Sequence, residues 1–317
     1  MEHFVTLFDY NFLPQGLTLY TSMERHIKSY TLWILCVDDN VFTSLQELNL
    51  RHVRLLQLSK LETSELLKVK AERNKGEYCW TLTPLTFKFV FEADKKIKRV
   101  TYLDADLWFM KSPEPIFQEF DISNKQVLIT EHAYASKYDQ TSSSGRFCVQ
   151  FLTITKKGGE LVRVWWEDRC MEWCFDRVED NKFGDQKYLD CWPEKFANLV
   201  HILQHKEYAL APWNAIRYPY SAGIFWHFHG IRLNRNKRLI FGHSYQIPKN
   251  TYEYVYIPYI KDFSDNISLM AKNNINIPIQ INSFLPKHFL SKALKKIKNR
   301  LVFFHETLFG KKLKFRN

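Results

Sequence analysis

The sequence has no apolar run approaching the roughly 20 residues that a membrane-spanning helix needs. It also has no charged and apolar leader before the first predicted strand, residues 4–8. Internal repeats and low-complexity tracts are absent as well. We therefore expect a protein that stays in the cytoplasm, with one large α/β domain and an appendage.

Cysteine is sparse, with six residues among 317. A chain of this length needs no disulfide to hold its core, so we expect reduced, buried thiols and no disulfide. Cys170 and Cys174, with Cys191, His201 and His205, could be taken for a zinc site. No second closely spaced cysteine pair follows, and the neighbouring tryptophans indicate a packed helix instead.

Acidic residues are nearly missing from the C-terminal end. Residues 287–317 carry ten lysines and arginines against Glu306 alone, which is +9 of the chain's net +11. A nucleic-acid-binding protein, the competing class, predicts basic residues throughout the fold, so we expect no nucleic acid partner. Apolar residues recur every three or four positions from Leu290 to Leu308, which predicts a basic amphipathic helix. We expect it to contact an anionic membrane surface, with packing on the rest of the chain as the alternative.

The N-terminal third alternates short apolar runs with helical patterns. This rhythm indicates βαβ units and a mostly parallel sheet. Further along, a helical pattern near residues 78–92 leads into a strand that ends at residue 103. The predicted strands cover residues 4–8, 32–37, 53–58, 100–103, 127–130 and 147–155, and the predicted helices include residues 16–28 and 159–175.

Beyond His243 the strand and helix rhythm stops, and prolines recur at positions 248, 258, 278 and 286. We place a domain boundary near residue 245. The expected organisation is an α/β domain at 1–245, an irregular extension at 246–286 and the basic tail at 287–317.

Two aspartates, Asp104 and Asp106, stand where the strand 100–103 ends, and an apolar run follows at 107–110. Buried carboxylates are costly unless they are paired or bind metal. At positions i and i+2 they can share one hard divalent ion, which takes diphosphate oxygens in its other positions. The carboxyl end of a strand is also where open α/β sheets bind ligands. The pair therefore predicts a cation site that binds a diphosphate.

The stretch Tyr102-Leu103-Asp104-Ala105-Asp106 resembles the hallmark of the family 8 glycosyltransferases, which include lipopolysaccharide galactosyltransferases and glycogenin. Further stretches are similar to family motifs and occur in the family's order. They are Asp9-Tyr10-Asn11-Phe12, Gly184-Asp185-Gln186, Ala211-Pro212-Trp213-Asn214 and His227-Phe228-His229-Gly230. The resemblance covers residues 4–243 and implies the GT-A fold, a Rossmann-like mixed sheet flanked by helices.

The resemblance also implies roles for particular residues. Catalytic roles fall on Asp185 and Gln186. The metal ligands would be Asp104, Asp106 and His227, with His229 as the fallback, although His227 as a hydrogen-bonded core histidine is the alternative. Nucleotide-sugar contacts would come from Phe8, Asp9, Asn11, Phe12, Lys88, Asp104, Ala105, Asp106 and Gln150, and Arg25, Lys28, Arg232 and Lys237 are further candidate cations.

The activity implied by the resemblance is transfer of a hexose from a nucleotide-diphosphate sugar, with a leaning to uridine. The acceptor would be a glycan or a lipid-linked sugar of bacterial surface polysaccharide, and the enzyme would lie on the inner face of the cytoplasmic membrane. Mn²⁺ is the expected cofactor, with Mg²⁺ as the alternative, because two carboxylates and an imidazole suit a borderline ion. Retention of configuration is expected. An inverting enzyme with Glu131 or Asp185 as the base is the alternative.

The chain departs from the family pattern at two places. Gln150-Phe151-Leu152 stands where the family has Asn-x-Gly, and residues 231–235 replace its Lys-Pro-Trp. These departures indicate a related but separate family, and they leave donor sugar and stereochemistry open. A nucleotidyltransferase would need a glycine-rich phosphate loop after the first strand, where Gly16 stands alone. The intact aspartate pair argues against an inactive sugar-binding relative.

Overall fold

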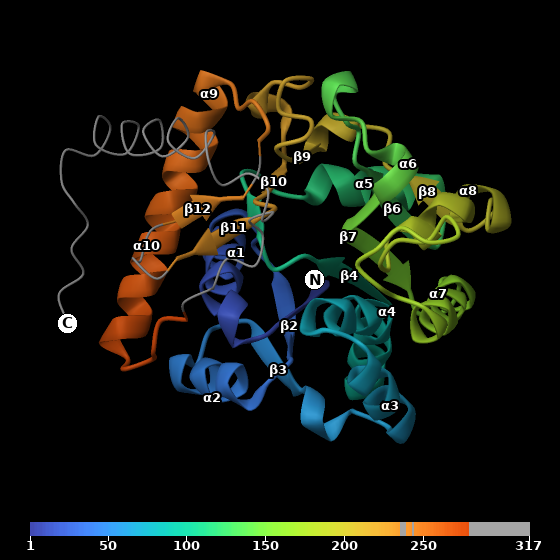
Figure 1. Ribbon diagram of the computed structural model, residues 1–317, viewed down its shortest axis with the longest axis horizontal. Coiled ribbons are helices and arrows are strands. Elements are labelled where there is room, and N and C mark those ends of the chain that lie inside the picture. The colour runs from blue at the N-terminus through green and yellow to red at the C-terminus, as the bar shows by residue number, and fades with distance from the viewer. Residues whose placement is uncertain (235–238, 243, 279–317) are drawn as a thin grey trace, which may run out of the picture.

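The computed structural model describes residues 1–234, 239–242 and 244–278, and the basic tail at 287–317 lies outside them. A seven-stranded sheet forms the centre of the molecule (Figure 1). Its strands run in the order β3 (Val53–Gln57), β2 (Tyr30–Cys36), β1 (Glu2–Phe8), β4 (Arg99–Leu103), β7 (Phe147–Thr155), β6 (Val127–Glu131) and β8 (Val200–Ile202).

The first four of these strands are parallel, and β7 is antiparallel to both of its neighbours. Strands β1, β2 and β4 are buried on both faces along most of their length, which explains why they are nearly continuous apolar runs. The predicted α/β class with a mostly parallel sheet is confirmed, and β7 supplies the mixed character.

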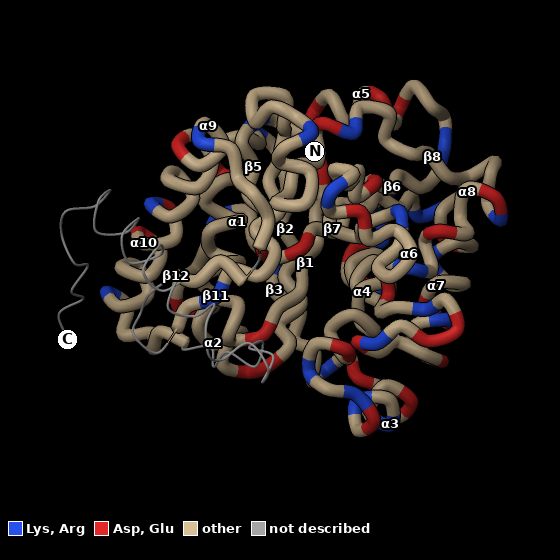
Figure 2. Tube along the Cα trace, turned by 45° about the horizontal axis from the view of Figure 1, so that its top comes forward, with Lys and Arg blue, Asp and Glu red and all other residues tan. Residues whose placement is uncertain are grey.

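Helices cover both faces of the sheet. One core cluster forms where α4 (Lys75–Ala93) and α7 (Glu160–Glu172) pack on one face. The other core cluster gathers α1 (Leu13–His26), α2 (Asp39–Leu48) and α5 (Glu114–Ser123) on the opposite face. The short helix α3 (Ser64–Glu72) precedes α4, and Lys, Arg, Asp and Glu alternate along α3 and α7 (Figure 2).

Helix starts follow local capping chemistry. Asn74 and Glu77 form a reciprocal capping box at the start of α4, and the Asp38 carboxylate caps α2. Each cap satisfies backbone N–H groups that would otherwise lack a partner. These caps fix where α2 and α4 begin, and both starts lie beside the loop that follows β1.

A second, three-stranded sheet in the order β5 (Leu107–Phe109), β10 (Phe225–His227) and β9 (Ala209–Leu210) continues from the turn after β4. The hairpin of β11 (Ile231–Leu233) and β12 (Leu239–Phe241) follows it. Short helices lie in the connections: α6 (Thr141–Ser144), α8 (Trp192–Lys195) and the 3-10 turns η1 (Tyr10–Phe12), η2 (Leu58–Lys60), η3 (Ser136–Tyr138), η4 (Lys187–Cys191), η5 (Lys206–Tyr208) and η6 (Tyr220–Ala222).

The segment expected to be irregular is instead largely helical. Residues 249–272 form α9 (Lys249–Thr251), the π-helical turn η7 (Tyr252–Tyr256) and α10 (Ile257–Lys272) without a break. Pro248 stands at the N-cap of α9 and Pro258 in the first turn of α10. Both prolines are among those that, with the loss of strand and helix rhythm, predicted an irregular extension, but proline is tolerated at helix starts because no N–H is needed there.

Helix α10 lies alongside α1 (Figure 1) and buries its apolar face in the same core cluster as α1 and β5. The Asp262 carboxylate accepts two hydrogen bonds from Arg25, at 2.8 and 2.9 Å, and one from the Trp108 indole at 2.9 Å. Residues on both sides of position 245 therefore share one core. Among the described residues, no helix is both long and apolar enough to span a bilayer.

Candidate active site

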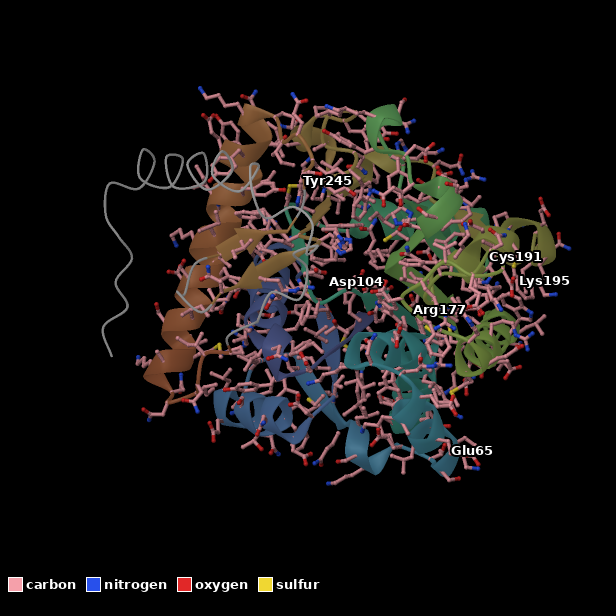
Figure 3. All side chains as sticks on the ribbon, viewed as in Figure 1. Glu65, Asp104, Arg177, Cys191, Lys195 and Tyr245 are labelled. Atoms are coloured by element: carbon pink, nitrogen blue, oxygen red, sulfur yellow. The ribbon has the colours of Figure 1, made fainter. Side chains whose placement is uncertain are left out.

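Asp104, Ala105 and Asp106 form the turn between β4 and β5. The Asp104 amide donates to the Gln150 carbonyl of β7 at 3.1 Å, and the Leu107 amide donates back to the Asp104 carbonyl at 3.1 Å. The small Ala105 side chain is buried between the two aspartates. Because β1 and β4 are parallel, this turn opens on the same carboxyl edge of the sheet as Asp9 after β1. Figure 3 labels Asp104 near the middle of the molecule.

Strand β10 brings His227 to this turn. His227 pairs with Leu107 across the β5–β10 ladder, and the Phe228 amide donates to the Asp106 carbonyl at 2.9 Å. The imidazole Nε2 lies 3.1 Å from Asp106 Oδ1 and 3.7 Å from Asp104 Oδ2. The structure thus gathers the three predicted ligands around one point.

The charges of this trio are strongly coupled. Burial raises the pKa of Asp104 to about 6, with the Asp106 charge adding to it and His227 opposing it. Burial also acts to raise the pKa of Asp106, but the facing imidazole brings it down to about 2. Burial alone would lower the pKa of His227, yet the two carboxylates hold it well above its usual value. The half-buried Asp104 carboxylate and the buried Asp106 carboxylate therefore favour a positive charge beside them, which a proton on His227 supplies when no other cation is bound.

Gln150 orients the imidazole. Its Oε1 lies 2.8 Å from His227 Nδ1, so Nδ1 carries the proton and donates it. This leaves Nε2 as the nitrogen that faces the carboxylates. A histidine whose second nitrogen donates to an oxygen is the usual arrangement of a metal ligand. The residues therefore fit a divalent cation by their donor types, their burial and the tautomer of His227.

Cys148 on β7 is a further member of this site that sequence reasoning missed. Its Sγ and one ligand atom each of Asp104 and His227 all lie within 4.8 Å of one another. The thiol is buried and hydrogen-bonds His227. The sequence offered no signal for it, because Cys148 has the apolar neighbours of an ordinary core thiol.

Asp185, one of the two predicted catalytic residues, is buried beside the cation site. Its backbone carbonyl accepts from the Trp166 indole at 2.8 Å, while its Oδ2 has no hydrogen-bond partner in the structure. Burial raises the pKa of Asp185 to about 7, and the nearby Asp104 charge adds to this against a hydrogen bond from Thr83. An unpaired buried carboxylate oxygen next to the cation site is available to a substrate hydroxyl.

Gln186, the other predicted catalytic residue, points to a different loop. Its Nε2 donates to the Ser144 carbonyl at 2.8 Å, and the neighbouring Lys187 ammonium donates to the carbonyls of Thr141 and Ser142 at 3.2 and 2.9 Å. These bonds hold α6 in place. No described contact brings the Gln186 side chain to Asp104.

The loop of residues 9–12, called the base loop below, follows β1 and carries predicted nucleotide-sugar contacts at Asp9, Asn11 and Phe12. The Asp9 carboxylate accepts from the Asn11 amide at 3.0 Å and the Phe12 backbone at 3.2 Å, and it pairs with Lys75 at 2.5 Å. Phe8 is buried against Gly16 of α1. Lys75, at the start of α4, is a cation of this site that the sequence analysis did not select.

Two of the candidate cations, Lys88 and Arg232, lie differently with respect to the site. Lys88, predicted to face the phosphates, pairs instead with Glu167 of α7 at 3.8 Å. Arg232 on β11 lies over the Phe12 ring, 4.5 Å from its centroid. Burial lowers the pKa of Arg232, and the charges of Asp106 and Asp9 partly restore it, so both carboxylates lie near the guanidinium. Arg232 therefore stands between the base loop and the cation site.

An aromatic wall borders the site on the side of His229. His132 stacks on Tyr134 with ring centroids 4.6 Å apart, and both contact Trp213, whose ring centroid lies 5.4 Å from His227 and 5.9 Å from His229. Beyond His229 opens a pocket of about 400 Å³, lined by Lys137, Tyr138, Asp139, Gln140, His229, Gly242, Ser244 and Tyr245. Tyr245 is labelled above Asp104 in Figure 3.

Two proteins of Bacillus subtilis (strain 168) resemble the whole chain or most of it. YfnD is 30% identical over 306 residues, covering 90% of this chain and 95% of YfnD. YfnF is 31% identical over 238 residues, covering 70% of this chain and 78% of YfnF. This chain belongs to the YfnD and YfnF family. Both relatives are described as uncharacterized proteins, and no family model matches the chain.

Solved glycosyltransferases share the fold of this YfnD and YfnF family member. The galactosyltransferase LgtC, solved with donor and acceptor sugar analogs, superposes with a TM-score of 0.53 at 14% identity, covering 83% of this chain and 95% of LgtC. Apo GlyE of Streptococcus pneumoniae TIGR4 gives 0.52 at 16% identity, covering 88% and 65%. The bifunctional WbbM gives 0.51 at 14% identity, covering 86% and 51%. At these identities the likeness is one of fold, and the predicted GT-A fold is confirmed.

Proposed function

We propose that this chain is a divalent-cation-dependent glycosyltransferase that moves a hexosyl group from a uridine-diphosphate sugar to a glycan or lipid-linked acceptor, with retention of configuration. The observation that carries the proposal is the convergence of Asp104, Asp106 and His227 at the carboxyl edge of a GT-A sheet. Asp185, with an unpaired oxygen, lies beside them. This donor set supports Mn²⁺, with Mg²⁺ as the alternative.

Asp104, Asp106 and His227 would hold the cation, and Gln150 would keep Nε2 of His227 facing it. When bound, the cation supplies Lewis-acid stabilisation of the charge that builds on the departing nucleoside diphosphate. Arg232 faces the same region from β11 and would add a second positive charge to the diphosphate. It stands in the segment 231–235 that replaces the Lys-Pro-Trp of the resembling family, and it would take over the phosphate contact that this chain otherwise lacks.

On the sugar side, the unpaired Oδ2 of Asp185 would accept a hydrogen bond from a donor-sugar hydroxyl. The bond between sugar C1 and the phosphate oxygen breaks while the acceptor oxygen bonds to C1 on the same face. The acceptor proton passes to the leaving phosphate oxygen, so no side chain is required as a base. The Gln186 Nε2 group is held by the Ser144 carbonyl, so only its Oε1 would be free to accept a hydrogen bond from the donor sugar.

Inversion with Glu131 as the base has less support from the geometry. The Glu131 carboxylate is paired with Arg146 at 2.7 Å and Lys206 at 2.9 Å. Burial acts to raise the pKa of Glu131, but these two cations bring it below its usual value. Both oxygens are occupied and weakly basic, which is the opposite of what a general base needs. Asp185 remains the candidate base for an inverting reaction.

The acceptor would approach over the aromatic wall. Sugar rings present apolar faces that pack on aromatic side chains, and Tyr134 and Trp213 offer such surfaces beside His227. The pocket beyond His229 would hold the next part of the acceptor. For a lipid-linked acceptor, the basic tail at 287–317 would contact the anionic membrane, a proposal that rests on the sequence alone. Sedimentation of the full chain with anionic vesicles, but not with neutral ones, tests it.

A hydrolysis screen of nucleotide-sugars with and without Mn²⁺ tests the central proposal. We expect one uridine-diphosphate hexose to be turned over only with the cation, and Asp104→Ala to abolish this turnover. The anomeric configuration of the product, read by NMR, separates retention from inversion. If no nucleotide-sugar is hydrolysed or bound more tightly with Mn²⁺ than without it, the proposed function fails.

A further inference from the structure

Cys148 occupies a position that no catalytic role described above requires. Its thiol is buried, and it lies within 4.8 Å of ligand atoms of Asp104 and His227. The three residues come from β7, from the end of β4 and from β10, so the fold itself brings them together. No other group of three or more candidate ligand residues in the described part of the chain lies this close together.

The donor types of this group differ from those of the carboxylate pair. A thiolate is a soft ligand that favours Zn²⁺ and related ions, whereas Mn²⁺ and Mg²⁺ prefer oxygen donors. In a tetrahedral zinc site with Zn–S near 2.3 Å and Zn–N or Zn–O near 2.0–2.2 Å, neighbouring ligand atoms lie about 3.5 Å apart. Side-chain movements of little more than about one ångström would bring Asp104, Cys148 and His227 to that spacing.

We propose that Cys148, together with Asp104 and His227, gives this cation site a second mode in which it captures thiophilic divalent ions such as Zn²⁺, Cd²⁺ or Co²⁺. In this mode a bond forms between the ion and Sγ, the S–H bond breaks, and the proton leaves to solvent. With a hard ion the thiol stays protonated and outside the coordination shell. The proposal rests on the cation site of the proposed function but adds a ligand to it.

Gln150 Oε1 accepts from His227 Nδ1 and so leaves Nε2 available to an ion in either mode. Asp106 is not part of the group that contains Cys148, and its carboxylate lies 3.1 Å from His227 Nε2. We therefore assign Asp106 to the oxygen-rich mode. Zn²⁺ is therefore expected to compete with Mn²⁺ and to inhibit the transfer reaction, because the thiolate replaces an oxygen ligand of the active ion.

The test titrates the full chain with Co²⁺ under reducing conditions and records the near-ultraviolet charge-transfer absorption of a cobalt–thiolate bond. We expect the absorption in the unmodified chain and in Cys191→Ser, a matched loss of an exposed thiol. Cys148→Ser should lose it, and its preference for Zn²⁺ over Mn²⁺ should fall by at least about tenfold. Cys148→Ala serves as a second variant with the same expectation.

A variant-free measurement guards against misfolding of the Cys148 variants. X-ray absorption of the full chain loaded with one equivalent of Zn²⁺ should show a single sulfur near 2.3 Å. Absorption that persists in Cys148→Ser, or a zinc shell without sulfur, overturns the proposal. If Mn²⁺ binds to the chain but Co²⁺ shows no thiolate absorption, this proposal fails while the proposed function stands; if neither ion binds, both fail.

Discussion

Gln150 Oε1 and His227 Nδ1 lie 2.8 Å apart, and this contact fixes which nitrogen of His227 faces Asp104 and Asp106. Gln150 stands where the chain departs from the family's Asn-x-Gly, so this departure lies in direct contact with His227, a predicted metal ligand. Outer contacts of this kind raise metal affinity by orienting the ligand.

We therefore expect Gln150→Leu to weaken Mn²⁺ binding by about 10–100-fold, because the Nδ1–H group loses its acceptor and the imidazole can rotate. Gln150→Glu keeps an acceptor and should lose less. Isothermal titration with Mn²⁺ measures both affinities. The control is Gln126→Leu, because Gln126 precedes β6 and accepts a hydrogen bond from Thr155 away from the site. Wild-type affinity in Gln150→Leu would contradict the assignment.

Arg232→Ala should weaken binding of uridine diphosphate in the presence of Mn²⁺ by about tenfold or more, because hydrogen bonds to charged groups contribute about 1.5–3 kcal/mol. Arg232→Lys keeps the charge but loses the planar fork, so it should recover only part of the affinity. Arg54→Ala removes an arginine that stacks on Trp33 and serves as the control. Equal affinities of the Arg232 and Arg54 variants for the nucleotide would remove Arg232 from the diphosphate site.

Asp185 makes stability depend on pH. Burial raises its pKa in the folded chain to about 7 from an ordinary value of 3.8, so the folded state binds the proton more tightly than the unfolded state. The resulting stabilisation is complete below 3.8 and is lost as the pH rises through about 7. The whole difference is on the order of 4 kcal/mol.

Asp185→Asn does not titrate. Without added metal, its melting temperature relative to wild type should rise as the pH increases from 5.5 to about 7 and should then level off up to pH 8.5. Thermal unfolding at several pH values measures this slope, and Asp168→Asn, which replaces an exposed aspartate of α7, is the control. A difference that stays constant with pH would show that Asp185 is not a buried, protonated carboxyl.

Gly16 explains how Phe8 is held in the predicted donor site. A Cβ at position 16 would lie 2.4 Å from Phe8 Cζ, so only glycine lets the ring pack on α1. Gly16→Ala should destabilise the fold by about 1–3 kcal/mol through overpacking. Phe8→Leu should recover part of this loss in the double variant. Denaturant unfolding of the single and double variants checks both, and an unchanged midpoint for Gly16→Ala would refute the packing argument.

The parts of the fold that depend on local pattern could be predicted from the sequence. Strands β1 to β4 are apolar runs between helical patterns, which predicts them directly, and Asp104 follows the last of these strands. Cys148 and Lys75 could not be found in this way, and Arg232 was only one of several candidate cations. The importance of Cys148 and Arg232 arises from the pairing of β4 with β7 and from the hairpin after β10, and that of Lys75 arises from its ion pair with Asp9 in the loop after β1. These contacts bring distant residues together and leave no local signal.

The same limit explains the helices beyond residue 245. Pro248 and Pro258 contributed to the prediction of an irregular extension, but both stand at helix starts. What decides the structure there is a tertiary contact, because Asp262 of α10 accepts hydrogen bonds from Arg25 of α1 and Trp108 of β5. No periodicity within residues 249–272 reveals these partners.

Asp262→Ala should therefore destabilise the whole domain and not only its C-terminal end. The substitution leaves the buried Trp108 N–H without an acceptor and the Arg25 guanidinium without its carboxylate, which together cost about 1–3 kcal/mol, since Arg25 is partly exposed. Asp265→Ala on the same helix removes an exposed pair with Lys261 and should cost less than about 0.5 kcal/mol. Denaturant unfolding followed by tryptophan fluorescence and by circular dichroism measures both variants. We expect both probes to report a single shifted transition, because α10 shares the core of α1 and β5. Equal effects of the two substitutions, or a separate early transition, would show that α10 folds independently of the sheet that carries the site.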